Sequence, residues 1–171
     1  MRYAPLPTLI RAAGREKLSP SRFALRWRSE MAKQAKNTFG GGRYVDVREG
    51  QAMGRYVDGF VIPVRKDRIE DYRRIAEQAA PIWKEHGALD YWECVGDDLD
   101  VKDLVAFPQL AQAGPDETVV FAWVVFESRE QRDLVNAKIA ADPRLGELVG
   151  ANPPFDMRRI TYGGFTVLVR G

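Results

Sequence analysis

TVVFAWVVF, residues 118–126, is the stretch that decides the fold. It contains no charged residue and is rich in β-branched and aromatic residues, which is typical of a buried strand. Side chains alternate between the two faces of a strand. One face receives Val119, Phe121, Trp123 and Val125, and the other receives Val120, Ala122, Val124 and Phe126. Both faces are apolar, so the sheet that contains this strand needs a cover on each side.

Three more strands and two helices are expected around this stretch. Alternating patterns predict strands at 56–64, 88–95 and 158–170, besides the strand at 118–128. Apolar residues at helical spacing predict helices at 67–86 and 129–141. The order β-α-β-β-α-β is the ferredoxin-like α+β arrangement, a four-stranded antiparallel sheet with two helices. Both helices are expected to pack on one face of the sheet.

Local signals fix the ends of the two helices. Asp67 with Glu70 resembles a capping box for the first helix, and Gly87 stands where a left-handed C-terminal cap belongs. Ser128 with Gln131 forms a capping-box pair for the second helix, which Asp142-Pro143 ends. Residues 145–156 are expected to form a loop.

Proline and glycine mark two irregular points in the strands. Pro63 is expected to lie at an edge or a bulge, because it cannot donate to the ladder of backbone hydrogen bonds. Gly163-Gly164 suggests a bulge or a sharp bend in the last strand.

Two helices can cover only one of the two apolar faces. If one face stayed in water, the fold would lose about 25 cal/mol of hydrophobic stabilisation for each Å² of apolar surface left unburied. We therefore expect a second copy of the sheet packed face to face in a two-fold homodimer. The alternative is that the loop at 96–117 or the N-terminal segment covers that face.

Composition limits the classes of function. One histidine and one cysteine are too few for a zinc site unless carboxylates complete it, so no metal is expected. Residues 1–52 carry 11 Lys and Arg against 4 Asp and Glu, a net +7, whereas residues 53–171 carry 15 against 20, a net −5. An acidic main domain argues against nucleic-acid binding. No apolar run is long enough to span a bilayer and no signal-peptide pattern follows Met1, so a cytoplasmic protein without membrane contact is expected.

The pentapeptide Gly-Arg-Tyr-Val-Asp occurs at 42–46 and again at 54–58. Only the second copy continues into an alternating apolar strand, so we expect the folded domain to span 53–171. Residues 1–52 are expected to be a basic, disordered N-terminal extension. Back-translation of Glu49-Gly50 gives a purine-rich stretch like a ribosome-binding site ahead of Met53, which suggests an over-extended reading frame. The alternative is a genuine basic arm or targeting segment.

From Tyr56 to Phe165 the chain resembles bacterial domain-of-unknown-function family 1428, the YbaA-like proteins. The matching runs are YVDGF (56–60), WKEHGAL (83–89), ECVGDD (93–98), VVFAWVVF (119–126), SREQRD (128–133), VNAKIAADPR (135–144) and PFDMRRITYGGF (154–165). The resemblance implies a ferredoxin-like dimeric α+β barrel. It implies no mechanism, because the family is uncharacterised.

His86 and Asp58 are the candidates for a catalytic role. Histidine is the residue type that titrates near neutral pH, and His86 ends a helix, where it is either a general base or a partner of the terminal carbonyls. Asp58 shares a strand face with apolar residues, where burial would raise its pKa and suit it to proton transfer. The alternative for Asp58 is an arginine partner or a place at the sheet rim.

Five other residues are candidates for lining a ligand pocket: Tyr91, Trp123, Arg132, Asn136 and Tyr162. The aromatic ones are equally suited to core or dimer packing. Arg132 and Asn136 lie four residues apart on one face of a helix. This face is expected either to bind a carboxylate or carbonyl group of a ligand or to be exposed to solvent. The sequence has no Gly-rich phosphate loop, no Gly-x-Ser-x-Gly elbow and no paired-histidine motif, so no cofactor is expected.

Two hypotheses of function follow. In the first, each subunit of the dimer binds a small molecule in an apolar pocket and acts on it without a cofactor, by analogy with monooxygenases and isomerases of the same fold. In the second, the dimer binds a metabolite or a protein without catalysis. A closed cavity that holds His86 or Asp58 beside an aromatic ring would favour the enzyme.

Overall fold

The computed structural model describes residues 54–150 and 152–170. The predictions for residues 1–52, including the first Gly-Arg-Tyr-Val-Asp copy, lie outside this part of the chain. The second copy leads directly into the sheet, because β1 (Tyr56–Arg65) begins within it. None of the helices in the described residues is long and apolar enough to cross a bilayer.

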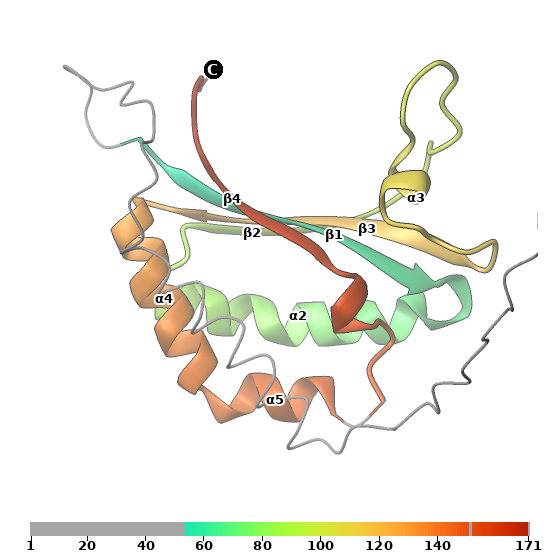
Figure 1. Ribbon diagram of the computed structural model, residues 1–171. Coiled ribbons are helices and arrows are strands. Elements are labelled where there is room, and N and C mark those ends of the chain that lie inside the picture. The colour runs from blue at the N-terminus through green and yellow to red at the C-terminus, as the bar shows by residue number, and fades with distance from the viewer. Residues whose placement is uncertain (1–53, 151, 171) are drawn as a thin grey trace, which may run out of the picture.

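The fold is α+β, with a four-stranded antiparallel sheet and helices on one side of it (Figure 1). Strand β1 pairs with β3 (Glu117–Phe126) and β4 (Thr161–Thr166), and β3 pairs with β2 (Asp90–Val95), which gives the order β2-β3-β1-β4. The helices under the sheet are α2 (Ile69–His86), α4 (Arg129–Ala141) and α5 (Pro143–Val149), and the loop with the short α3 (Phe107–Leu110) rises on the other side. Short 3-10 turns at Lys66–Arg68 and Met157–Arg159 precede α2 and β4.

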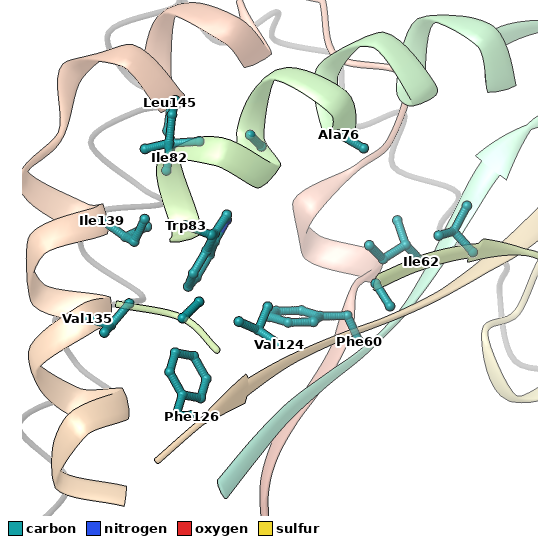
Figure 2. Close-up of a cluster of buried hydrophobic side chains, with 14 of the residues drawn as sticks. Phe60, Ile62, Ala76, Ile82, Trp83, Val124, Phe126, Val135, Ile139 and Leu145 are labelled. Carbon is teal, nitrogen blue, oxygen red and sulfur yellow. The ribbon is translucent and has the colours of Figure 1, made fainter. Parts of the chain in front are cut away.

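The face of the sheet that packs against the helices, here called the helical face, carries the main core. As predicted, this face of β3 presents Val120, Ala122, Val124 and Phe126, all of which are buried. Figure 2 shows side chains of α2, α4 and α5 pointing toward the same face, among them Trp83, Val135, Ile139 and Leu145. Apolar burial of this kind is the main term that stabilises a domain of this size.

The described residues cover the opposite face, here the open face, at one end only. Val61 and Val119 are buried there against Leu99, Ala111 and Ala113 of the loop before β3. Farther along, Trp92, Phe121 and Phe165 remain 49%, 42% and 59% exposed. The loop at 96–117, the alternative cover considered from the sequence, therefore covers part of this face, and the rest stays apolar and without a cover among residues 54–150 and 152–170.

Three local predictions are confirmed. Gly87 ends α2 in the left-handed region, with φ of 114°. Ser128 Oγ accepts a hydrogen bond from the Gln131 backbone N–H at 3.1 Å and so caps α4. Pro63 lies beyond Val61, the last residue of β1 that pairs with β4, so no ladder bond on that side is lost.

Two predictions about helix ends are wrong. Helix α2 begins at Ile69 after a 3-10 turn, and Asp67 does not cap it, because its carboxylate accepts hydrogen bonds from Arg65. Helix α5 occupies part of the predicted loop. Asp142 Oδ1 accepts from the Arg144 backbone N–H at 2.9 Å and Pro143 takes the first helical position, so Asp142-Pro143 ends one helix and starts the next.

The predicted bulge at Gly163-Gly164 is also wrong, since pairing with β1 continues without interruption through both residues. These glycines make room for side chains instead. A Cβ on Gly163 would lie 3.3 Å from the Phe165 ring, and a Cβ on Gly164 would lie 2.6 Å from the Tyr56 hydroxyl.

Gly164→Ala is expected to lower the free energy of unfolding by about 1–3 kcal/mol, because the new methyl group would push into Tyr56 and Arg132, which are both buried. Denaturant unfolding measures this change. Gly114→Ala is the matched control, since its Cβ would make only an ordinary 3.6 Å contact with Glu117, and we expect a change within about 0.5 kcal/mol. Equal stability of Gly164→Ala and the wild type would contradict the packing described for β4.

Candidate functional site

A carboxylate held by two phenols lies on the helical face near the β2 edge. Tyr91 and Glu93 of β2 both point toward the helices, and Tyr72 of α2 is buried opposite them. The Tyr72 hydroxyl donates to Glu93 Oε2 and the Tyr91 hydroxyl donates to Glu93 Oε1, each at 2.7 Å. Each carboxylate oxygen therefore has one donor, which fixes the orientation of the group.

Burial sets the electrostatics of these three residues. Burial raises the pKa of the Glu93 carboxyl, and the two phenol hydrogen bonds offset this only in part. Burial and the nearby carboxylate also raise the pKa of Tyr72 and of Tyr91, so both phenols keep their protons and act as donors. Among the described residues no cationic side chain forms an ion pair with Glu93.

The Glu93 carboxylate and its two tyrosine partners lie between an interior cavity and a surface groove. The cavity, of about 100 Å³, lies in the main core between the helices and the sheet, and its walls include Phe60, Ile75, Trp83, Ile139, Leu145 and Phe155. The groove, of about 420 Å³, runs between α2 and β2. Tyr72, Ala76, Tyr91 and Glu93 line both spaces. A molecule in the groove therefore reaches the carboxylate from solvent.

Four of the residues singled out in the sequence meet in a second cluster, around Asp58. The Asp58 carboxylate is fully buried on β1 and accepts from Asn136 Nδ2 at 3.1 Å and from the Tyr162 hydroxyl at 2.8 Å. Its other oxygen faces Arg132 Nε at 3.5 Å. Burial raises the pKa of Asp58, while the charge of Arg132 and the two hydrogen bonds oppose the rise.

The Asp58 cluster joins β1, β4 and α4 rather than forming a pocket wall. Arg132 also donates to the Tyr56 hydroxyl at 3.0 Å, and its guanidinium lies 4.8 Å from the centre of the Tyr56 ring. Neither the cavity nor the groove is lined by Asp58, Arg132 or Asn136. The cluster is therefore a buried ionic anchor between the sheet and the helix.

His86 and Trp123 lie away from the cavity. His86 Nε2 lies 2.8 Å from the Asp142 carboxylate, which also accepts from Arg144, so the histidine ties the end of α2 to the corner between α4 and α5. These partners hold the pKa of Asp142 well below its usual range, with Arg144 contributing most. Trp123 is on the open face, stacked on Trp92 with ring centroids 5.7 Å apart.

Of the pocket candidates taken from the sequence, Tyr91 is the one that lines the cavity, and Glu93 and Tyr72 were missed. A signal for Glu93 was present, because a carboxylate alternates with Tyr91 and Val95 on one face of a strand. Tyr72 falls within the helix predicted at 67–86, where helical spacing indicates a place in the core and says nothing about a partner on β2. No group of three or more His, Cys, Asp or Glu side chains is placed to hold a metal ion within residues 54–150 and 152–170.

Glu93→Gln is expected to change how stability depends on pH. The carboxyl ordinarily titrates near 4.5, and its pKa is raised in the folded protein, so its contribution to stability is present below that pH and is lost as the pH rises through the folded-state pKa. The free energy of unfolding of the wild type minus that of Glu93→Gln should therefore fall as the pH rises above 4.5. A difference that stays flat or rises over this range would mean that Glu93 is not buried as described.

Comparison with known proteins identifies relatives for most of the described chain. Residues 55–157 match the family described as "Protein of unknown function (DUF1428)". The protein named "Uncharacterized protein YbaA" in Escherichia coli strain K12 is 42% identical over 115 residues, which cover 67% of this chain and 97% of the relative. The proteins of the same name in Escherichia coli O157:H7 and Shigella flexneri match equally well. The chain therefore belongs to the DUF1428 family of YbaA-like proteins.

Proposed function

We propose that this protein is a homodimer in which each subunit binds a small, largely apolar molecule beside Glu93. The observation that carries the proposal is the position of a carboxylate, held by two phenols, between an apolar cavity and a groove that opens to solvent. Ligand sites are commonly mostly apolar pockets with a few convergent polar groups. The groove and the cavity together supply both parts.

The proposed architecture is a ferredoxin-like fold that assembles as a dimeric α+β barrel. The strand order β2-β3-β1-β4 supports it, because each of the crossovers β1-α2-β2 and β3-α4-β4 leaves a gap that a strand of the other unit fills. Both crossovers place their helices on the same face, which leaves the open face for assembly (Figure 1).

A second copy of the chain is the proposed cover of the open face. Trp92, Phe121 and Phe165 stay exposed on three different strands, and Val57, Gly59 and Val125 lie between them in the register. A continuous apolar surface across a sheet is larger than monomers usually leave in water. The same surface on a two-fold partner is self-complementary, and a stable dimer of this kind buries about 1,200–2,000 Å² in total.

Whether the site catalyses a reaction or only binds a ligand depends on the chemistry of Glu93. A half-buried carboxyl with a raised pKa is suited to take a proton from a bound molecule and return it, which is the chemistry open to a site without a cofactor. The analogy with monooxygenases and isomerases of the same fold agrees with such a role but does not supply it. Binding without catalysis remains the second candidate, since the two phenols already use one site on each Glu93 oxygen.

A thermal-shift screen of small aromatic and alicyclic molecules on the full chain tests the pocket. At least one molecule should raise the melting temperature of the wild type, and Ala76→Leu should abolish the shift, because residue 76 lines both the cavity and the groove. Gln78→Leu adds the same side chain at an exposed position of α2 and should keep the shift. The pocket proposal fails if no molecule stabilises the wild type, or if Ala76→Leu responds as the wild type does.

Light scattering on the full chain tests the dimer. The wild type should have twice the subunit mass, and Phe121→Lys should shift it toward the monomer, because a charge would be buried in the interface. Leu134→Lys is the matched control, since Leu134 is 60% exposed on α4, away from the open face, and this variant should remain a dimer. A monomeric wild type would refute the assembly.

A further inference from the structure

We propose that the ligand of this pocket carries a protonated amine whose ammonium group pairs with Glu93. The inference rests on the proposed pocket and adds the chemical class of what it binds.

Among residues 54–150 and 152–170, Glu93 differs from the other buried or half-buried carboxylates in having no cation beside it. Asp58 faces Arg132, Glu117 pairs with Arg159 at 2.7 Å, and Asp142 pairs with Arg144 at 2.6 Å. In the part of the chain that the structure describes, the hydrogen-bond partners of the Glu93 side chain are two neutral phenols. Carboxylates removed from water are usually paired with a cation, because an unbalanced buried charge is costly. A cationic ligand would supply that balance at Glu93.

Aromatic rings surround the place where the cation would lie. Trp83 stacks on Tyr91 with centroids 6.3 Å apart, and Phe155 meets Tyr72 edge-on at 5.7 Å. These four rings all line the cavity beside Glu93. The negative face of an aromatic ring attracts an ammonium group, most strongly where water is excluded. A carboxylate among aromatic rings is therefore better suited to an organic ammonium than to an anion.

The groove that leads to Glu93 also has an acidic balance. Its charged lining residues are Glu70, Arg73, Glu77 and Glu93. The single guanidinium is already shared, because Arg73 donates to both Glu70 and Glu77. Three carboxylates against one guanidinium give the groove a net negative charge, which favours the approach of a cation over that of an anion.

The apolar part of the ligand has a defined place. Beyond Glu93 the cavity is walled by Ile75, Ile139, Leu145 and Phe155, and its volume of about 100 Å³ suits a short hydrocarbon chain or part of a ring. The groove, of about 420 Å³, holds the remainder. Arylalkylamines, with an apolar ring two or three carbons from the nitrogen, are the class that fits both spaces.

Calorimetric titration of the full chain near neutral pH with three probes of similar shape tests the inference. The probes are 2-phenylethylamine, the neutral 2-phenylethanol and the anionic 3-phenylpropanoate. The amine should bind at least about tenfold more tightly than the alcohol, and the carboxylate should bind most weakly, because the amine alone gains a desolvated ion pair. Glu93→Gln should bring the amine to within about twofold of the alcohol while leaving the alcohol unchanged.

Glu77→Gln is the matched control, since it removes a carboxylate from the groove without changing the Glu93 site, and it should keep the preference for the amine. The inference is overturned if the wild type binds the alcohol as tightly as the amine, or if Glu77→Gln removes the preference as fully as Glu93→Gln does. In both cases probe binding itself leaves the pocket proposal intact. If none of the probes binds and the thermal-shift screen also finds no ligand, the pocket proposal fails together with the inference. If Glu93→Gln does not fold, the comparison of the three probes on the wild type still tests the preference for the amine.

Discussion

Strand β3 has apolar side chains on both faces, and each face needs a cover. The side that carries Val120, Ala122, Val124 and Phe126 is packed against α2, α4 and α5, which makes the main core. Its other side meets the loop before β3 around Val119 and at Phe121, whose ring centroid lies 5.7 Å from that of Phe107, and Phe121 still remains 42% exposed. This asymmetry organises the molecule, because the helical face contains the cavity while the open face offers a surface for assembly.

The two carboxylates of the helical face show how the same residue type takes different roles. Asp58 and Glu93 lie on either side of β3, in adjacent rows of the sheet. Asp58 is fully buried, Asn136 and Tyr162 donate hydrogen bonds to one of its oxygens, and Arg132 forms an ion pair with the other, so it anchors the helix to the sheet. Glu93 accepts hydrogen bonds from two phenols, has no cation beside it in the part of the chain that the structure describes, and borders a space that opens to solvent. Its unbalanced charge, rather than its burial alone, makes it the functional candidate.

Patterns along the chain predicted the strands, the two long helices and the face that each β3 side chain takes, because these depend on local periodicity. Other features required knowledge of neighbours distant in sequence. Gly163-Gly164 looks like a bulge until the Phe165 ring and the Tyr56 hydroxyl are placed beside it. His86 is a candidate from the sequence because of its residue type, yet its partner Asp142 lies 56 positions away along the chain. Glu93 was overlooked because alternation on a strand does not say whether a carboxylate meets solvent or two tyrosines.

The central claim is that the open face is buried by a second copy of this chain. Hydroxyl-radical footprinting of the full-length wild type and of Phe121→Lys, read residue by residue, measures it directly. We predict that Trp92, Trp123 and Phe165 are protected in the wild type and become reactive in the variant, while Leu134 on α4 reacts equally in both. Open-face rings that react in the wild type as readily as Leu134, or that stay protected in a monomeric variant, would contradict this account.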